Sequence, residues 1–243
     1  MKNRFAAALG HISKFFTLAT IFVVPLVWLP VTLEAHELPK YTVLYAGVFF
    51  ALLSYLLRAI SLRFVSFRRT ALDIPVLLLW AVVLATSVLS ADQFTSFVGD
   101  YGILGVSFFG WSAFTLLYFL LTQHLTRLKD VYYVLGLLLC SISLAAALAL
   151  AREFGITGPI FGLTVPGALP HAARLLSGLV FTWAVIVALG FLADKRLSLL
   201  VSIVSGCAFS IGVVGVFLWG IPLLWILLSV ATGVLLMFFF NSF

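Results

Sequence analysis

The stretch Leu197–Phe243, LSLLVSIVSGCAFSIGVVGVFLWGIPLLWILLSVATGVLLMFFFNSF, is the clearest sign of the fold class, because its 47 residues include no charged side chain. A helix needs about 20 apolar residues to cross the hydrocarbon core of a bilayer, so this stretch is too long for one crossing. The sequence Trp219-Gly220-Ile221-Pro222 divides it, since proline cannot continue a helical hydrogen-bond ladder and glycine permits a tight turn. We therefore expect two transmembrane helices here, over 197–217 and 223–240.

The rest of the 243-residue chain repeats this pattern. Only 9% of the residues are charged and 64% are hydrophobic, whereas soluble domains carry about 25% charged residues. This composition excludes a soluble globular domain, a disordered chain and a fibre, and the net charge of +6 is not gathered on one polar face as in a nucleic-acid-binding module. The intervals between charged residues predict six further spans, over 15–33, 41–60, 74–90, 103–122, 131–151 and 175–193. The sequence therefore predicts an all-α, polytopic transmembrane helix bundle of about eight helices, forming one domain over residues 1–243.

Lysine and arginine are unevenly divided between the two ends of these spans. Eleven fall in the N-terminal segment, the 58–73 and 123–130 loops and the 194–196 turn, and three, Lys40, Arg152 and Arg174, fall on the other side. Because positively charged short loops stay in the cytoplasm, we expect both termini of this multi-pass protein to be cytoplasmic. No small-residue cleavage site follows the first apolar run, so we expect this run to be retained as a helix.

The predicted spans contain no charged residue near their middle, which argues against an ion-coupled transporter or a voltage sensor. Cys140 and Cys207 lie inside predicted helices without metal-binding or redox spacing, and we interpret both as buried packing residues. Glu34, His36 and Glu37 lie together, but on a short outward loop that is typical of hydrated residues. We predict no metal site, no cofactor and no nucleic-acid partner; membrane lipids are the expected surroundings.

The outward segment Arg152–Arg174, REFGITGPIFGLTVPGALPHAAR, is rich in glycine and proline yet apolar. We expect such a segment to lie in the interface or to dip into the bundle. Arginine binds phosphate oxygens through its planar fork, and histidine moves protons near neutral pH. We therefore predict that Arg152 and Arg174 bind a lipid pyrophosphate and that His171 is the catalytic base. In the alternative interpretation both arginines anchor helix ends at the lipid headgroups, and His171 is an ordinary loop residue.

Two stretches carry a resemblance to a known family. The first is Leu29-Pro30-Val31-Thr32 followed by Glu37-Leu38-Pro39-Lys40. The second, RTALDIPVLLLWAVVLATSVLSADQFTSFVGDYGILG over 69–105, enters a helix through Leu72-Asp73-Ile74-Pro75 and leaves it through Ser87, Ser90, Asp92, Ser96 and Gly99. Together they resemble the N-terminal part of bacterial O-antigen ligase and O-antigen polymerase proteins, over roughly residues 20–122.

The resemblance implies a many-helix membrane glycosyltransferase of polysaccharide or lipopolysaccharide biosynthesis. Such an enzyme takes a glycan from undecaprenyl pyrophosphate and passes it to a lipid or glycan acceptor at the outer side of the inner membrane, without a cofactor. The family's large periplasmic loop with its arginine and histidine has no counterpart before Phe243. No catalytic residue therefore transfers from the family, and we expect the chain to be the front part of a longer protein or a short relative.

Two other functions remain open at this point. A flippase or transporter for a lipid-linked glycan would need a hydrophilic central cavity, which the charge-free spans do not favour. A non-catalytic membrane scaffold, or a truncated family member, would explain why no large loop is found.

Overall fold

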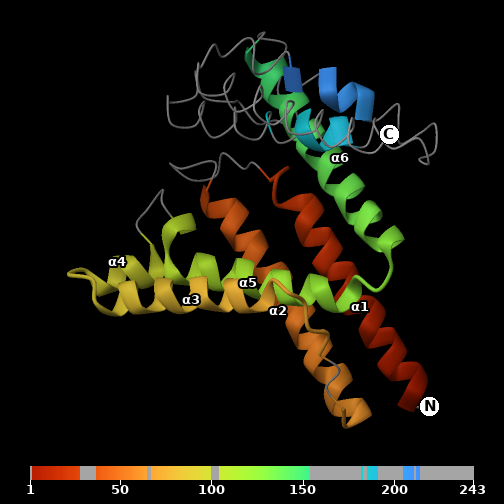
Figure 1. Cartoon of the computed structure of the whole chain (residues 1–243), viewed down its shortest axis with the longest axis vertical. Coiled ribbons are helices and arrows are strands. Elements are labelled where there is room, and N and C mark those ends of the chain that lie inside the picture. The colour runs from red at the N-terminus through yellow and green to blue at the C-terminus, as the bar shows by residue number, and fades with distance from the viewer. Residues whose placement is uncertain are drawn as a thin grey trace. The chain divides into compact units, whose positions relative to one another are not determined.

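The computed structural model describes residues 2–27, 37–64, 67–99 and 104–153, residue 182, and residues 185–190, 205–210 and 212–213 (Figure 1). All regular structure in this part of the chain is helical, as the sequence predicted. The chain divides into two compact units, Met1–Tyr132 and Tyr133–Phe243. The prediction of a single domain over the whole chain stays a prediction.

The described helices follow the predicted spans in order. They are α1 (Lys2–Val23), α2 (Glu37–Leu62), α3 (Asp73–Val88), α4 (Gln93–Val98), the 3-10 helix η1 (Leu104–Val106), α5 (Phe108–His124) and α6 (Leu128–Glu153). Within the described residues, Arg4–Val23 and Leu38–Leu62 are the two helical stretches long and apolar enough to cross a membrane, and α3 is a shorter apolar helix. The sequence predicted about eight spans for the whole chain.

Helix boundaries differ from the predicted spans in three places. Helix α1 begins at Lys2 and ends at Val23, whereas the predicted span runs from 15 to 33. The predicted span was drawn from the uncharged run alone. The helix also includes Arg4 and Lys14, because a helix tolerates charged side chains that reach solvent. Helix α2 begins at Glu37, because Pro39 lies in its first turn, where a missing N–H costs nothing. Helix α5 begins at Phe108 rather than 103, because η1 precedes it.

Side-chain caps define several of the helix ends. The Ser107 hydroxyl accepts a hydrogen bond from Gly110 N at 3.1 Å and so caps α5. Asp130 accepts from Thr126 N and Arg127 N at 3.2 and 2.9 Å at the start of α6. Helix α2 ends at Leu62, and the next residue, Arg63, adopts a left-handed conformation with φ 53°, at a position where glycine is usual.

Helices α1 and α2 pack as an antiparallel pair through small and polar residues. The Ser13 hydroxyl donates to Ala51 O at 3.0 Å, and further along the pair Thr20 lies directly against Gly47. The face of α1 that is buried here carries Ser13, Thr17 and Thr20, all nearly without exposure. Because small residues let two backbones approach closely, this is the packing expected of membrane helices.

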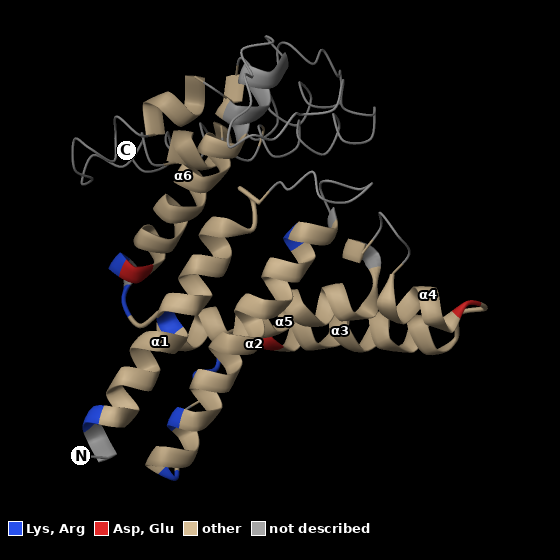
Figure 2. Ribbon diagram, turned by 180° about the vertical axis from the view of Figure 1, so that it is seen from behind, with Lys and Arg blue, Asp and Glu red and all other residues tan. Residues whose placement is uncertain are grey.

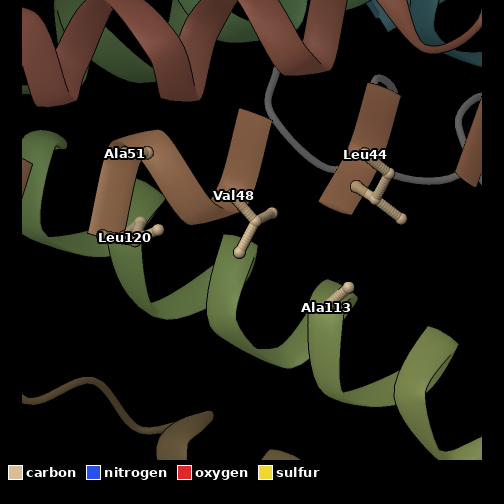
Figure 3. Close-up of a cluster of buried hydrophobic side chains, with 5 residues drawn as sticks. All are labelled: Leu44, Val48, Ala51, Ala113 and Leu120. Atoms are coloured by element: carbon tan, nitrogen blue, oxygen red, sulfur yellow. The ribbon is translucent and has the colours of Figure 1, made fainter. Parts of the chain in front are cut away.

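Helix α5 packs on α2 around the main hydrophobic cluster of the first unit. The cluster consists of Leu44, Val48 and Ala51 of α2 and Ala113 and Leu120 of α5 (Figure 3). Leu44 and Ala113 lie towards one end of this interface and Ala51 and Leu120 towards the other, so α2 and α5 run in the same direction.

Helix α3 packs antiparallel to α5. At the start of α3, Asp73 accepts a hydrogen bond at 3.0 Å from the hydroxyl of Tyr118, which lies in the C-terminal half of α5. In the middle of α3, Trp80 donates at 2.9 Å to Ser112, which lies near the N-terminus of α5. Helices α3 and α5 lie side by side and run across the α1–α2 pair (Figure 1).

The described surface of the first unit is apolar and its interior is partly polar. On α3 the buried residues are Asp73 and Ser87, 7% and 5% exposed, whereas Ile74 and Leu78 are 70% and 62% exposed. Both buried residues of this helix are thus polar, whereas its large apolar residues are exposed together with Thr86, opposite to the arrangement of a helix on a soluble domain.

In the second unit, three predicted spans meet within the described residues. Leu139 of α6 packs against Ala188 and Ala208, which lie in the helical pieces 185–190 and 205–210. Cys140 and Cys207 are free and exposed, so the prediction that both are buried packing residues is wrong. Each cysteine is next in sequence to a packed residue, and a one-residue step along a helix turns a side chain by 100°, away from the contact.

Candidate functional site

The side chains of the three predicted site residues are not among those that the structure describes. Arg152 lies in the last turn of α6, but its side chain is not among the described ones. His171 and Arg174 lie outside the described residues, as do Glu34, His36 and Asp100. The prediction of a pyrophosphate site formed by Arg152, Arg174 and His171 therefore stays a prediction.

A different polar group is assembled where α1, α2, α5 and the start of α6 meet. We name it the His124 cluster, and it consists of Ser13, Lys14, Arg58, His124 and Asp130. His124 Nε2 lies 3.2 Å from the Ser13 hydroxyl, which itself donates its proton to Ala51 O. Because a hydroxyl has one proton to donate, the Nε2 atom must carry the proton of the hydrogen bond to Ser13.

Two positively charged side chains approach His124 from α1 and α2. Lys14 follows Ser13 directly, and Arg58 lies across Gly10, the glycine one turn before Lys14; a Cβ at Gly10 would lie 3.1 Å from a guanidinium nitrogen. Burial, and then the charges of Lys14 and Arg58, lower the pKa of His124 to about 4. His124 is therefore neutral near pH 7, and positive charge at this place is carried by Lys14 and Arg58.

Asp130 is mainly a helix cap. Its Oδ2 accepts from Thr126 N, the Thr126 hydroxyl and Arg127 N at 3.2, 3.1 and 2.9 Å. Its Oδ1 lies 3.6 Å from Lys14 Nζ, beyond hydrogen-bond distance. The carboxylate is thus committed to α6, and its ion pair with Lys14 is loose.

The segment 67–72, which precedes α3, is hydrogen-bonded to the end of α5 beside the His124 cluster. Arg68 N donates to Gln123 Oε1 at 2.8 Å, and the Arg68 guanidinium donates to Leu125 O at the end of α5. Thr70 then donates to Asp73 through its backbone N–H and its hydroxyl, at 2.8 and 2.6 Å. The 58–73 and 123–130 loops, which the sequence assigned to one side of the membrane, are thus in direct contact.

At the opposite end of α3, the serines that carry the family resemblance hold a turn. Asp92 accepts from Thr95 N and caps α4, and Ser96 donates to the Ser90 hydroxyl at 2.7 Å. Gly99 ends α4 with φ 95°, a conformation that L side chains rarely adopt. These residues shape the connection and present no reactive group.

Most lysines and arginines of the first unit lie at the end that carries the His124 cluster. Figure 2 shows them at the N-terminal part of α1, the C-terminal part of α2 and the start of α6, and not along α3 or α5, whereas Lys40 lies at the opposite end, at the start of α2. No group of three or more His, Cys, Asp or Glu that could hold a metal ion occurs in the described part of the chain.

Sequence reasoning noticed the charged loops but missed the His124 cluster as a unit. The available signal was a polar residue beside each predicted span end, at Ser13, Lys14, Arg58 and His124. Only the packing of α1 against α2 and α5 shows that these three ends meet.

In the described residues the protein is all-helical, and two of its helices are long and apolar enough to cross a membrane. Comparison with family models, with curated proteins and with solved structures finds no match for the chain. The resemblance to O-antigen ligases and polymerases therefore stays a prediction.

Proposed function

We propose that the chain is a multi-pass protein of a bacterial inner membrane, with eight spans and both termini cytoplasmic. The observation that carries this proposal is the reversed exposure of α3, whose large apolar residues are exposed and whose buried residues are Asp73 and Ser87. Water would not favour so much exposed apolar surface, whereas lipid tails would. Apolar exposed side chains also cover α2, at Phe49, Phe50 and Ile60.

The directions of the helices support the same topology. Helix α2 is antiparallel to α1 and parallel to α5, and α3 is antiparallel to α5. These directions are required if successive helices cross the membrane in opposite senses, starting from a cytoplasmic N-terminus. The contact between the 58–73 and 123–130 loops also agrees with their assignment to the cytoplasmic side.

Cysteine accessibility tests this topology in intact cells. In a Cys140→Ser, Cys207→Ser background, Asp92→Cys reports the turn after α3, and Arg127→Cys reports the loop after α5. We expect a membrane-impermeant maleimide to label position 92 from outside and position 127 only after permeabilisation. Labelling of positions 92 and 127 from the same side would refute a membrane crossing by α5. This helix is the one to test, because α3 and α5 run across the α1–α2 pair.

For the activity, we propose transfer of a glycan from undecaprenyl pyrophosphate to a lipid or glycan acceptor at the outer face of that membrane. The support is the family resemblance of 20–122 together with the residues of the outward segment 152–174. Arg152 and Arg174 hold the pyrophosphate. An acceptor hydroxyl attacks the anomeric carbon, His171 takes its proton, and the bond to the pyrophosphate oxygen breaks, releasing undecaprenyl pyrophosphate.

Transfer in proteoliposomes with a lipid-linked glycan and a lipid acceptor tests this activity. We expect a new glycosidic product, at least tenfold less of it with Arg152→Ala, Arg174→Ala or His171→Ala, and no change with Arg127→Ala, an exposed arginine of the opposite loop. Movement of the donor across the bilayer without product would identify a flippase. Neither product nor movement would leave a scaffold.

A further inference from the structure

The His124 cluster lies where the inner membrane surface is expected. Lys14 directly precedes the predicted span 15–33, Arg58 lies two residues before the end of 41–60, and His124 follows 103–122 by two residues. Asp130 directly precedes 131–151. These four boundaries were drawn from the sequence independently, yet their residues meet at one place in the structure. Lys14 and Arg58 lie inside the helical stretches Arg4–Val23 and Leu38–Leu62, so it is the uncharged runs after Lys14 and before Arg58 that place the cluster at the membrane surface in the topology proposed above.

The cluster holds positive charge that its own residues do not neutralise. Among the described residues, Lys14–Asp130 is the ion pair found, so Arg58 has no carboxylate partner there. Asp130 already caps α6 through Oδ2 and meets Lys14 only at 3.6 Å. Both cations remain accessible in part, and Lys14 is 41% exposed.

The Arg58 guanidinium reaches from α2 onto α1. Gly10 has no side chain, and the guanidinium packs beside it, so that a Cβ there would lie 3.1 Å from a guanidinium nitrogen, one turn of α1 before Lys14. Arginine and lysine on two adjacent helices, beside a neutral histidine at the end of α5, form a basic site. Basic sites between membrane helices at the cytoplasmic side suit anionic lipid headgroups.

We propose that Arg58 and Lys14 bind the phosphate of an anionic phospholipid of the inner leaflet, such as phosphatidylglycerol, beside His124. This inference rests on the membrane topology proposed above and not on the glycan-transfer activity. The lipid's acyl chains would lie along the exposed apolar residues of α2, of which Leu56 and Leu57 adjoin Arg58. A lipid phosphate rather than free phosphate is favoured, because the site adjoins this apolar surface.

Lipid selectivity in nanodiscs tests the proposal. The full chain is placed in phosphatidylcholine discs, and the association of spin-labelled phosphatidylglycerol is compared with that of spin-labelled phosphatidylcholine. A basic residue near an anionic lipid contributes about fivefold in binding. We expect Arg58→Gln and Lys14→Gln each to lower the selectivity for phosphatidylglycerol by about fivefold.

Matched controls separate a defined site from diffuse surface charge. Arg127→Gln and Lys129→Gln remove the same charges from exposed positions at the start of α6, and we expect no change with either. Equal losses in all four variants, or none in any, would overturn the proposal. Displacement of the lipid by millimolar inorganic phosphate would show a site for free phosphate and would equally overturn it.

A second measurement does not depend on any variant at Arg58 or Lys14. A bound phosphate would favour protonated histidine, so the pKa of His124 should rise when phosphatidylglycerol replaces part of the phosphatidylcholine. Histidine NMR, with His124→Gln to assign the signal, measures this, and an unchanged pKa would refute the site. Failure of the chain to enter nanodiscs at all would instead refute the proposed topology.

Discussion

Replacement of Gly47 by alanine tests the close packing of α1 against α2. A Cβ built at Gly47 would overlap the Thr20 hydroxyl and lie 3.0 and 3.1 Å from Thr20 Cβ and Cγ2. Carbon atoms in favourable contact lie about 3.5–4.0 Å apart, so the two helices must separate by about 0.5–1 Å at this level. Thr20 cannot easily turn away, since it is buried and its hydroxyl donates to Phe16 O at 2.7 Å.

Two opposing effects set the magnitude. Forcing an extra methyl group into a packed interface costs about 1–3 kcal/mol, while exchanging glycine for alanine inside a helix contributes about 1 kcal/mol of stability. Gly47→Ala should therefore lower the free energy of unfolding by about 0–2 kcal/mol. The matched control is Gly136→Ala on α6, where no atom lies within 4 Å of the new Cβ in the described structure, and which should gain about 0.5–1 kcal/mol.

Thermal unfolding in detergent, followed by circular dichroism at 222 nm, measures the difference. About 2–4 °C per kcal/mol is typical at this chain length, so Gly47→Ala should melt about 1–12 °C below Gly136→Ala. Thr20→Ala should cost less in the Gly47→Ala background than alone, because it removes the overlapping atoms. Equal melting temperatures for the two glycine variants, with no coupling to Thr20→Ala, would refute the packing described for α1 and α2.

Three further predictions concern helix ends and the His124 cluster. The pKa of His124 in the folded protein lies below its value in the unfolded chain, so the stability contributed by neutral His124 is complete above about pH 6.5 and is lost as the pH falls towards about 4. The melting temperature of the unsubstituted protein should therefore fall as the pH is lowered across this range. A fall of the same size in His124→Gln would contradict this prediction. Arg63→Gly should raise the free energy of unfolding by about 1 kcal/mol, because Arg63 has φ 53° at the end of α2, and a lower melting temperature would count against it. Ser107→Ala should lower stability by about 1 kcal/mol through loss of the α5 cap, measured in the same way; Ser61→Ala, whose exposed hydroxyl donates to Leu57 O within α2, is its control.

The charge pattern was enough to predict most helices of the first unit. Helices α2, α3, α5 and α6 lie where uncharged runs lie, because lipid-facing or buried helices exclude charge. The same rule failed at α1, which continues past Lys14 to Lys2. Charge marks where a helix leaves an apolar environment, whereas the helix itself ends only where its backbone hydrogen bonds end.

The prediction of helix α2 shows a second limit of sequence patterns. The predicted span 41–60 begins only after Leu38-Pro39-Lys40, whereas in the structure Glu37-Leu38-Pro39 begins α2. Helix α3 begins in the same way, with Asp73-Ile74-Pro75. An acidic residue suits the positive end of the helix dipole, and proline in the first turn loses no hydrogen bond, so both triplets start a helix and do not stop one.

The His124 cluster could not have been predicted, because it depends on which span ends meet. Ser13, Arg58 and His124 are far apart in sequence, and each alone is a common flanking residue of a span. What joins them is the close approach of α1 and α2, which in turn depends on Gly10 and Gly47 having no side chain. Sequence patterns fix helices well, but contacts between helices are set by such small residues only after the partners are known.

The residues that carry the family resemblance have structural roles wherever the structure describes them. Asp73 holds Thr70 and Tyr118 at the start of α3, Asp92 caps α4, and Ser90 and Ser96 bond to each other across the turn. Any protein that needs this helix and turn would select such residues, whatever reaction it performs. The resemblance therefore bears on the fold of residues 20–122, and the activity has to be tested at Arg152, His171 and Arg174. If glycan transfer is lost in the alanine variants of these residues and unchanged in Arg127→Ala, the protein is a glycosyltransferase and not a scaffold that has the same helices.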